Sequence, residues 1–584
     1  MKCNEQGDVH GFEEIRFNSL VLRGESIYSV DPKTQKEEFV CAAVKVEMVF
    51  RHIETGKIDL QLLYWCYDKW ERLKLNRGKL IKNELPFLLD SGLDVAGYKL
   101  KPALSFIDQH EKQHKPQYYH DKLGWAIFEK QLVYKHQKVI GPKKTFSNYK
   151  GNFLIEPHGD VQKWRVTIKQ WVVGHTPLEL MLAAGFSAVL VGLLNVSKKA
   201  DVDSLIFHLA GNSTTGKTTA VMVAVSAFGS PSMKNGLLQS YNGTKNAMIG
   251  MLTGNYGAPI VFDESSMNRM NKQALSGLLY EIAQNMERAR MDKDANVKEI
   301  NTWATSVFST GEHTMVGNSN ANEGIRARLF EFVNVEWTKD AAASDQLKEV
   351  LLNNYGNAAP YFIRHLQKVG VENIYTKWEE YKKQLSKDMP PSKFKDRIGN
   401  KFALVLTAAH FANESLKLNL SINAIADMLI QQEERSMGER ELGPKFYRLL
   451  KEKLIQYKRN FKFDRRDNTG DYEIWGFIEE KKGKTYCYIL PSIFEKLVGE
   501  LGFSDSSILM DELKKMDVLD REEDKNKKRK VIFSEGEGEK RKKILGDKPY
   551  SRKGDYTVCI VYQENIFEDL DKLNMNTKAR GYQK

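Results

Sequence analysis

Apolar and polar positions alternate near the start of the chain, in the pattern of strands with one buried face. The stretch VKVEMVF places Val44, Val46, Met48 and Phe50 on one side. A Thr-Gly turn signal then precedes IDLQLLYW, which is typical of a returning strand. The stretches NELPFLLDSG and KPALSFIDQHEKQH favour helices instead, so we expect residues 1–165 to form a mixed α/β domain.

A long helix is predicted in HTPLELMLAAGFSAVLVGLL. Thr176 is the expected N-cap, Pro177 suits the first helical position, and Glu179 would complete a capping box. The nearly all-apolar stretch that follows is too short to cross a bilayer comfortably, because a span needs about 20 apolar residues. We therefore expect a buried core helix.

From about residue 200 to 340, short apolar strands alternate with helical patterns, so a core domain with a parallel sheet is expected over 166–340. Residues 341–450 are predicted to be a helical lid with connecting helices. In residues 451–584, the strand KTYCYILP precedes two helices, SIFEKLVGELG and SDSSILMDELKKM, and two strands, KVIF and DYTVCIVYQ. Two helices followed by a hairpin predict a winged-helix domain.

The chain is basic, with a formal net charge of +12. This charge favours polyanionic partners, nucleic acid before an anionic membrane, although a solvated lysine-rich surface is the plain alternative. The five cysteines include no C-x-x-C pair, so neither a disulfide framework nor a structural zinc site is indicated. The N-terminus lacks the apolar core of a signal peptide, so we expect a cytoplasmic protein without a membrane partner.

The stretch GNSTTGKT fits the phosphate-binding pattern G-x-x-x-x-G-K-[ST], between the strand LIFHLA and the helix TAVMVAVSAF. Its glycines let backbone N–H groups converge on phosphate oxygens, and the helix N-terminus favours the same anion. Lys217 would reach the β and γ phosphates, and Thr218 would offer its hydroxyl to Mg²⁺. The predicted ATP-binding residues are Gly211, Asn212, Ser213, Thr214, Thr215, Gly216, Lys217, Thr218 and Thr219.

Two further strands end in polar residues that would face this loop. APIVFDESS ends in Asp263, which would hold Mg²⁺ together with Thr218, and in Glu264, which would polarise the attacking water. WATSVFST ends in Ser309 and Thr310, and either would hydrogen-bond beside the γ-phosphate, at the sensor 1 position of ring-forming ATPases. An ordinary solvated strand end is the alternative for each pair.

The stretch EGIRARLFEF carries two arginines before another strand. An arginine that one subunit supplies to its neighbour stabilises the charge of the γ-phosphate in the transition state. Arg328 is the preferred candidate and Arg326 the second, and a surface arginine without this role is the alternative.

The stretch NMERARMDKDANVKEINTW precedes the strand WATSVFST and has the pattern of a basic β-hairpin around a KDAN turn. In the pore of a ring, its cations would follow a phosphate backbone and move with the nucleotide state. A solvated hairpin without a ligand is the alternative. The predicted DNA contacts are Arg288, Arg290, Lys293 and Lys298.

The C-terminal domain holds a second basic segment, in the loop between its last two strands. Lys525 to Lys530 and Lys540 to Lys543 suit DNA phosphates, but the acidic run EGEGE lies between them. A DNA-binding wing and a regulatory or ring-stabilising domain therefore remain equal alternatives.

The motifs from HTPLELMLAAGFSAVLVGLL through HLAGNSTTGKTT, VFDE, RARMDKD, STGE and RARLFEF resemble the domain-of-unknown-function family found in helicases of phages and mobile elements. More closely, the chain resembles the Cch-type helicases of staphylococcal cassette chromosome elements, which are similar to the hexameric MCM replicative helicases. The likeness covers about residues 165–420 well and the C-terminal domain more loosely. It implies an α/β fold with an AAA+ P-loop core, a helical lid and a C-terminal winged helix.

The resemblance also implies roles for single residues. Arg397, in DRIGNKFALVL, matches a sensor 2 arginine that acts on a neighbour's ATP, and Lys293 matches the hairpin residue that touches DNA. The catalytic set that it implies is Lys217, Asp263, Glu264, Thr310, Arg328 and Arg397.

Together these features predict an ATP-dependent hexameric DNA helicase with ATP and Mg²⁺ as its cofactors. It would move along single-stranded DNA, unwind forked duplex and support replication of a mobile element, with element-encoded replication proteins as further partners. An AAA+ replication initiator or DNA-remodelling ATPase without processive unwinding uses the same motifs and is the alternative. A protein-remodelling ATPase would need an aromatic pore residue, which the hairpin lacks.

Overall fold

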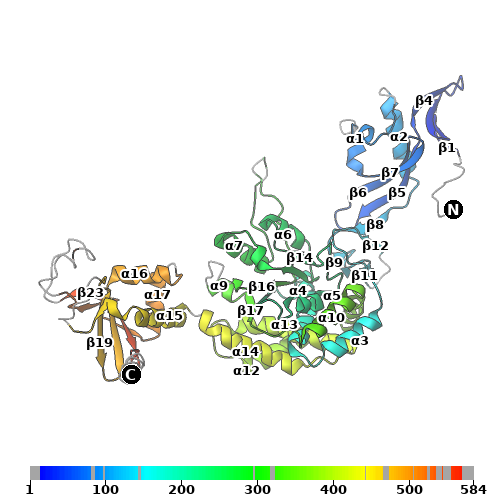
Figure 1. The fold of residues 1–584 in the computed structure, drawn as a ribbon. Coiled ribbons are helices and arrows are strands. Elements are labelled where there is room, and N and C mark those ends of the chain that lie inside the picture. The colour runs from blue at the N-terminus through cyan, green and yellow to red at the C-terminus, as the bar shows by residue number, and fades with distance from the viewer. Residues whose placement is uncertain are drawn as a thin grey trace, which may run out of the picture. The chain divides into compact units, whose positions relative to one another are not determined.

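The computed structural model describes residues 14–80, 86–95, 99–141, 146–291, 293, 296–315, 323–440, 442–464, 472–503, 506–522, 526–533, 542 and 554–567. The chain divides into two compact units, one that reaches Ile430 and one that starts at Gln431 (Figure 1). Each unit has a hydrophobic core of its own.

The first unit begins with two sheets of N-terminal strands. Strands β1 (Ile15–Phe17), β2 (Leu20–Arg23), β3 (Ser26–Val30) and β4 (Glu37–Ala42) form an antiparallel sheet in sequence order. The next sheet has the order β12-β8-β5-β6-β7, with β5 (Val44–His52), β6 (Ile58–Cys66), β7 (Lys69–Asn76), β8 (Gln117–His120) and β12 (Ser147–Tyr149). Helices α1 (Pro86–Asp90) and α2 (Leu100–Glu111) complete this region (Figure 1). Phe106 of α2 shares a buried core with Val44 of β5.

Strand β5 corrects one detail of the predicted alternation. Its pairing with β6 shifts register between Val46 and Met48, which marks a β-bulge or a similar irregularity. The extra residue moves the apolar face by one position, so that Val49 is buried and Met48 is only half-buried. Strict alternation over the whole stretch was therefore wrong at Met48.

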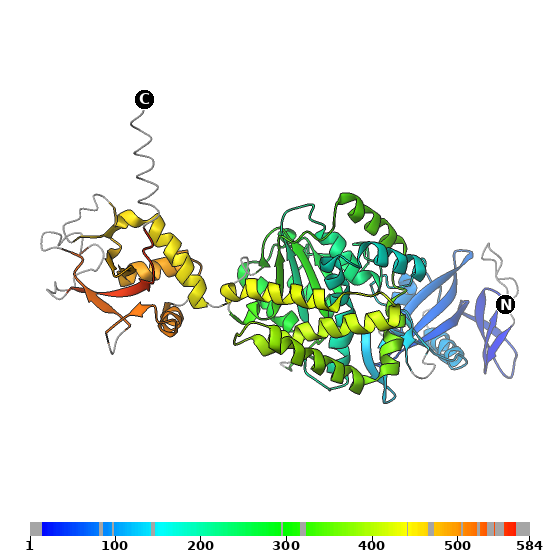
Figure 2. The same cartoon turned by 90° about the horizontal axis from the view of Figure 1, so that it is seen from below.

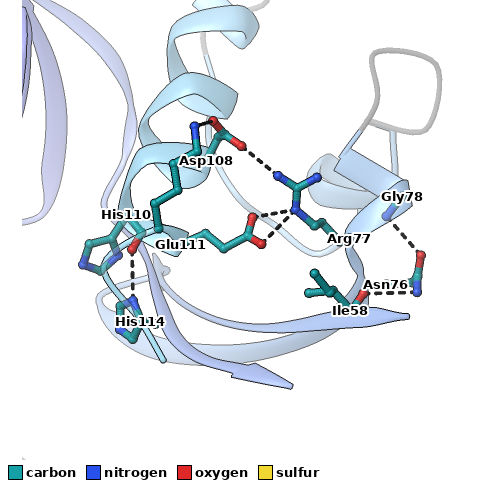
Figure 3. Close-up of polar contacts among 9 residues, drawn as sticks. Ile58, Asn76, Arg77, Gly78, Asp108, His110, Glu111 and His114 are labelled. Atoms are coloured by element: carbon teal, nitrogen blue, oxygen red, sulfur yellow. Dashed lines mark hydrogen bonds and ion pairs between the residues drawn. The ribbon is translucent and has the colours of Figure 1, made fainter. Parts of the chain in front are cut away.

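Helix α2 is fastened to the end of β7 by ion pairs (Figure 3). Arg77, which opens the 3-10 helix η1 (Arg77–Leu80), donates from Nε to both carboxylate oxygens of Glu111 at 2.8 Å and from Nη2 to Asp108 at 2.8 Å. On the sheet side, Nδ1 of His110 accepts a hydrogen bond from the backbone N–H of Val46. Burial lowers the pKa of His110 to about 4, so the neutral ring serves as this acceptor at neutral pH.

The centre of the first unit is a five-stranded parallel sheet with the order β14-β15-β16-β13-β17. Its strands are β13 (Leu205–Ala210), β14 (Leu238–Ser240), β15 (Ile260–Asp263), β16 (Ser306–Gly311) and β17 (Leu329–Val333). Parallel strands need crossover connections, and helices α5 (Lys217–Ser226), α6 (Lys245–Leu252), α7 (Lys272–Ala283) and α9 (Glu323–Arg326) lie in them. The predicted α/β fold with a P-loop core is confirmed.

Both faces of this sheet are covered, which explains why its strands are almost entirely apolar. Phe207 of β13 belongs to the larger core cluster, together with residues of helices α4 (Thr176–Val196) and α5. The neighbouring Ile206 belongs to a second cluster with residues of α6 and α7. The alternation within one strand therefore serves two separate cores.

Helix α4 is the core helix that the sequence predicted. Its residues from Leu178 to Leu194 are buried. The expectation that it is too short to cross a membrane was wrong, because by length and composition it is the one described helix that could do so, but 94% of its apolar window is buried inside the protein.

The predicted capping box of α4 is wrong, because His175 occupies the N-cap position and no side chain caps the helix. Glu179 instead accepts a hydrogen bond from the backbone N–H of Gly174 at 2.8 Å. Its second oxygen accepts from the N–H of Ser421 at 3.0 Å, so the side chain joins the start of α4 to the distant helical region.

Helices from residue 341 onwards form a layer beside α4. They are α10 (Ala341–Asn353), α11 (Ala359–Val369), α12 (Val371–Asp388), α13 (Lys395–Leu416) and α14 (Ile422–Arg440), and α12 and α13 run alongside one another (Figure 2). Phe402 of α13 contacts Phe330 of β17, so this lid is packed on the edge of the parallel sheet.

A three-stranded sheet from the predicted N-terminal domain also packs into this core. It consists of β9 (Gly124–Phe128), β10 (Gln131–Lys135) and β11 (Val139–Ile140), and helix α3 (Val161–Trp171) follows. Trp125 donates from Nε1 to the carbonyl of Val189 in α4 at 2.9 Å, and the Tyr134 hydroxyl donates to the carbonyl of Gly257 at 2.8 Å. These bonds attach residues before 165 firmly to the P-loop core.

The second unit combines helices α15 (Leu442–Gln456), α16 (Pro491–Glu500) and α17 (Ser506–Lys515) with one sheet. Its strands are β18 (Phe461–Lys462), β19 (Gly476–Lys481), β20 (Lys484–Ile489), β21 (Leu519–Asp520), β22 (Lys528–Lys530) and β23 (Asp555–Tyr562). Strands β22 and β23 pair antiparallel as expected, although β22 ends where the predicted strand KVIF begins. Lys525 of the first basic run, and Lys540, Arg541 and Lys543 of the second, lie outside the described residues.

Candidate functional site: a phosphate-binding loop and an acidic strand end

The glycine-rich loop lies between β13 and α5, as its sequence pattern requires. Gly211 has φ +150° and Gly216, at the N-cap of α5, has φ +84°. A Cβ on Gly216 would lie 2.5 Å from Oγ1 of Thr338, so both backbone conformation and space require glycine there. The Lys217 ammonium donates to the carbonyls of Gly211 at 2.8 Å and Asn212 at 2.6 Å, which keeps this cation inside the loop.

Asp263 is the point at which the predicted site residues meet. Strand β15 ends at Asp263, and the hydroxyl of Thr310 on the adjacent strand β16 donates to its Oδ1. Oγ1 of Thr218, in the first turn of α5, lies 3.4 Å from the same oxygen. The structure therefore brings together the loop, the acidic strand end and the polar strand end that the sequence predicted would face one another.

The electrostatics of Asp263 favour a bound cation. Its side chain is almost fully buried, and burial raises its pKa. The Thr310 hydroxyl opposes this rise, and the nearby Glu264 carboxylate adds to it. No group of three or more His, Cys, Asp or Glu side chains that could hold a metal occurs among the described residues. A Mg²⁺ here would thus take Asp263 and Thr218 as protein ligands and depend on nucleotide phosphates for others.

Glu264 follows directly and has an unusual backbone. Its φ of 62° lies in the left-handed region, which is uncommon for a residue with a Cβ. The backbone N–H donates to Oγ1 of Thr310 at 3.0 Å, and the carboxylate accepts from the Ser266 hydroxyl at 2.5 Å. Because strained backbone of this kind concentrates at functional positions, the conformation supports a special role for Glu264.

Strand alternation separates the two candidates at the end of β16. Thr310 contacts Asp263, whereas the hydroxyl of Ser309 lies 2.8 Å from Nδ1 of His208 and accepts from the hydroxyl of Tyr241 at 3.0 Å. Ser309 is thus engaged in a buried network on the other face of the sheet. The geometry favours Thr310 as the residue beside a γ-phosphate.

His208 is a residue of this region that the sequence reasoning missed. It lies in the middle of β13, and its Nε2 donates to the carbonyl of His313 at 2.9 Å. Burial lowers its pKa to about 4, so the ring is neutral and can bridge Ser309 and the loop after β16. The available signal was a single polar residue within the otherwise apolar strand LIFHLA.

Replacing Asp263 by Asn should stabilise the protein, and it removes the carboxylate that would bind a metal ion. A carboxyl whose pKa is raised by folding destabilises the protein once it is ionised, and this cost disappears as the pH falls through the raised pKa. At pH 7 we expect an unfolding midpoint on the order of 1–3 °C above wild type, with the difference shrinking towards pH 4, and loss of ATP hydrolysis. Thermal unfolding followed by circular dichroism at both pH values tests this, and a lower midpoint at pH 7 would contradict it.

Two predicted site residues lie elsewhere. Arg328 directly precedes β17, and the parallel pairing of Ile206 with Leu329 places it level with the start of β13. The loop follows the end of β13, six residues or about 20 Å along the strand. Arg397, on α13, donates to Asp203 in the segment before β13, at the same edge as Arg328. The side chain of Arg326 is not among those that the structure describes.

The basic segment before β16 has the expected antiparallel form. Met286 pairs with Thr302 and Met291 with Val297, as isolated bridges rather than as a continuous ladder. Lys293 is exposed in the turn between the two arms, although residues 292, 294 and 295 lie outside the described part of the chain.

The other cations of this hairpin are accessible as well. Arg288 and Lys298 are exposed, and Arg290 donates to Oδ1 of Asn246 at 2.6 Å. The hairpin between α7 and β16 therefore carries several exposed basic side chains.

The basic run of the second unit is largely engaged within its own fold. Lys530 pairs with Glu479 at 2.7 Å, Lys528 pairs with Asp520, and Arg529 lies over the ring of Tyr556. These contacts leave less unbalanced charge for phosphates than the sequence alone indicates.

Comparisons with known proteins agree with this architecture. The family described as a domain of unknown function, DUF927, matches residues 21–302, and the family described as the Cch helix turn helix domain matches residues 441–565. The solved structure of "SCCmec type IV Cch - active helicase" has a TM-score of 0.72 to this chain at 21% identity, covering 94% of this chain and 98% of that chain. A search of curated proteins gave no match. The predicted resemblance to Cch-type proteins is confirmed at the level of the fold.

Proposed function

We propose that this protein is an ATP-dependent DNA helicase, built as an AAA+ ring that uses ATP and Mg²⁺. The observation that carries the proposal is the convergence of Lys217, Thr218, Asp263, Glu264 and Thr310 at one edge of a parallel sheet. The protein shares its fold with a structure described as an active helicase. This likeness supports DNA unwinding as the work that ATP hydrolysis at the site would drive.

The side chains of the site divide the work of hydrolysis. Lys217 would bind the β and γ phosphates, and Thr218 and Asp263 would hold the metal, while the Thr310 hydroxyl donates a hydrogen bond that orients Asp263. Glu264 takes the proton of the attacking water as general base. Mg²⁺, when bound, neutralises the charge that develops on the phosphate oxygens.

The position of the arginines supports a ring. Arg328 and Arg397 lie about 20 Å along the sheet from the loop of their own chain, too far to touch its nucleotide. In a ring, both arginines could reach the nucleotide bound to a neighbouring copy. Each ATP site would then be built from residues of two subunits. We propose a homo-hexamer, in keeping with the resemblance to MCM-like helicases.

In this proposal the hairpin of residues 286–302 contacts a single DNA strand and moves with the nucleotide state. The exposed Lys293 and the basic residues of its arms supply phosphate contacts. The protein would act on forked DNA during replication of a mobile element, beside other element-encoded replication proteins. The alternative, an initiator or remodelling ATPase that melts DNA without processive unwinding, is supported by the C-terminal match to a helix turn helix domain.

Strand displacement on a forked DNA tests the proposal, with wild-type protein and the Glu264→Gln variant compared in the presence of ATP and Mg²⁺. We expect displacement by the wild type and none by the variant. ATP hydrolysis that DNA stimulates, without any displacement, would instead favour the initiator or remodelling function. Absence of ATP hydrolysis by the wild type would overturn both.

Replacing Lys293 by Ala should uncouple unwinding from hydrolysis. The residue is exposed in the hairpin turn and is not part of the loop that would bind phosphate, so basal ATP hydrolysis should stay within about twofold of wild type. Loss of one phosphate contact in every subunit should lower strand displacement at least about tenfold and weaken the salt dependence of DNA binding.

The control for this prediction is Lys348→Ala, which also removes one lysine, but from helix α10 and not from the hairpin. It should leave displacement unchanged. Complete loss of ATP hydrolysis in Lys293→Ala would contradict a role of the hairpin as a DNA contact alone.

A further inference from the structure

Three cationic side chains surround one carboxylate at the amino ends of the parallel strands, which is the end of the sheet opposite the loop. Oδ2 of Asp203 accepts from Nη2 of Arg397 at 2.7 Å, and it lies 3.3 Å from Nζ of Lys401 and 4.0 Å from Nε of Arg328. We call these four residues the Asp203 cluster.

The Asp203 cluster joins separate parts of the first unit. Asp203 precedes β13, which leads into the phosphate-binding loop, and Arg328 precedes β17. Arg397 and Lys401 lie one turn apart on α13, so that both point from the same face of this lid helix. A single carboxylate thus connects the P-loop core to the lid.

Charge within the cluster is unbalanced, with three cations for one anion. The side chain of Lys401 is 3% exposed, and burial together with Arg397 lowers its pKa to about 8, although Asp203 opposes this. The buried Nε of Arg328 and the buried Nζ of Lys401 have no hydrogen-bond acceptor among the described residues, and each meets Asp203 only as an ion pair. A buried positive charge destabilises a protein when too little negative charge lies near it. An anion from a neighbouring molecule would therefore stabilise the Asp203 cluster.

Access to the cluster differs among its cations. The side chain of Arg397 is 37% exposed and that of Arg328 is 16% exposed, so both can reach an anion on a neighbouring molecule. Lys401 is enclosed and cannot do so. Its contact is with Asp203, whose pKa is lowered because Lys401 and Arg397 outweigh the effect of burial.

From this geometry we infer that Asp203 and Lys401 are positioning residues for Arg328 and Arg397, which they hold together for the nucleotide of the neighbouring subunit. Asp203 accepts a hydrogen bond from Nη2 of Arg397 and pairs at 4.0 Å with Nε of Arg328, whose Nη1 donates to the carbonyl of Gly324, so that Nη2 of Arg328 and the other N–H groups of Arg397 are the donors left for phosphate oxygens. Lys401 fixes the carboxylate from the interior. The inference rests on the proposed ring ATPase, and it adds two residues that no motif marks.

A fixed pair of arginines matters because small displacements of a catalytic group are expensive. A shift of about 1 Å can lower a rate about 100-fold. In Asp203→Asn the neutral amide cannot hold three cations, so the arginines separate. We expect kcat for ATP hydrolysis to fall about 10- to 100-fold, while the affinity of the variant's own loop for ATP is unchanged.

The matched control is Asp201→Asn, which removes the same charge two residues earlier at an exposed position. It should behave as wild type. Lys401→Met keeps the buried stem without its charge and should lower kcat in the same direction as Asp203→Asn. If Asp203→Asn fails to fold by circular dichroism, Lys401→Met carries the test.

Mixed rings separate a positioning role from a purely structural one. Asp203→Asn subunits retain their own loop and general base, and Glu264→Gln subunits retain their arginines. When the two inactive proteins are mixed, a Glu264→Gln subunit can present its arginines to the loop of an Asp203→Asn neighbour. We expect ATP hydrolysis in the mixture to exceed the sum of the separate activities several-fold.

A mixture of Arg328→Ala with Glu264→Gln serves as the reference. Recovery in that reference, but not with Asp203→Asn or Lys401→Met, would overturn the inference and leave the proposed function standing. No recovery in the reference, with an active wild type, would show that the arginines do not act between subunits and would also overturn it. A wild type that does not hydrolyse ATP would overturn the proposed function itself.

Discussion

Glu264→Gln should lower the rate of ATP hydrolysis by about 10² to 10⁴-fold, the usual contribution of a general base. Gln has nearly the shape of Glu, and its amide oxygen can still accept the hydrogen bond from Ser266. The contact between the backbone N–H of Glu264 and Thr310 does not involve the side chain and should persist. The variant therefore loses the proton acceptor and little else.

ATP binding is the second readout for this variant. Lys217 and the loop are untouched, so the dissociation constant for ATP should stay within about threefold of wild type. Titration with a fluorescent ATP analogue measures binding, and phosphate release measures hydrolysis. The control Glu372→Gln removes an exposed carboxylate, which pairs with Lys199, from α12 and should change neither quantity. Hydrolysis by Glu264→Gln above about a tenth of the wild-type rate would contradict the role of general base.

The sequence predicted those parts of the site whose geometry depends on the backbone conformation of a short segment. The loop is recognisable because Gly211 and Gly216 need conformations that other residues avoid, and because a strand and a helix flank them. Asp263 and Thr310 follow apolar strands, and parallel strands bring their ends to one edge. The proximity of these two side chains could therefore be expected from the amino-acid sequence alone.

Contacts between distant segments could not be predicted in the same way. Glu179 has the spacing of a capping residue, yet it bonds to Ser421, 242 residues away in the chain, and the predicted cap at Thr176 fails. The register shift in β5 depends on its pairing with β6, which alternation within β5 does not specify. Tertiary contacts decide such details even where local propensity is clear.

The Asp203 cluster is the strongest example of this limit. Asp203 and Arg397 lie 194 residues apart, and neither stretch contains a motif that refers to the other. The sequence indicated the two arginines separately, Arg328 from its position before a strand and Arg397 from the resemblance to MCM-like proteins. The geometry adds that both arginines share one carboxylate, and hence that a change in one should disturb the other.

Arg328→Ala should have the largest effect of any change at the proposed subunit boundary. An arginine supplied to a neighbour's γ-phosphate contributes about 10³ to 10⁵ in kcat. Arg328 donates from Nη1 to the carbonyl of Gly324 at 3.0 Å and lies against the ring of Tyr280, so its guanidinium is held at the sheet edge even before an anion arrives. Such preorganisation is what makes a charged group effective in a transition state.

The same geometry predicts how the loss divides between binding and rate. Because Arg328 lies about 20 Å from the loop of its own chain, ATP affinity measured in isolated subunits should be unchanged while kcat of the assembled protein collapses. Arg328→Lys keeps the charge but not the planar fork and should recover less than a tenth of the activity. Arg364→Ala, which removes an exposed arginine from α11, is the matched control and should hydrolyse ATP as wild type does. A loss of less than about tenfold in Arg328→Ala would show that this arginine does not stabilise the transition state, and that the excess charge of the Asp203 cluster serves another anion.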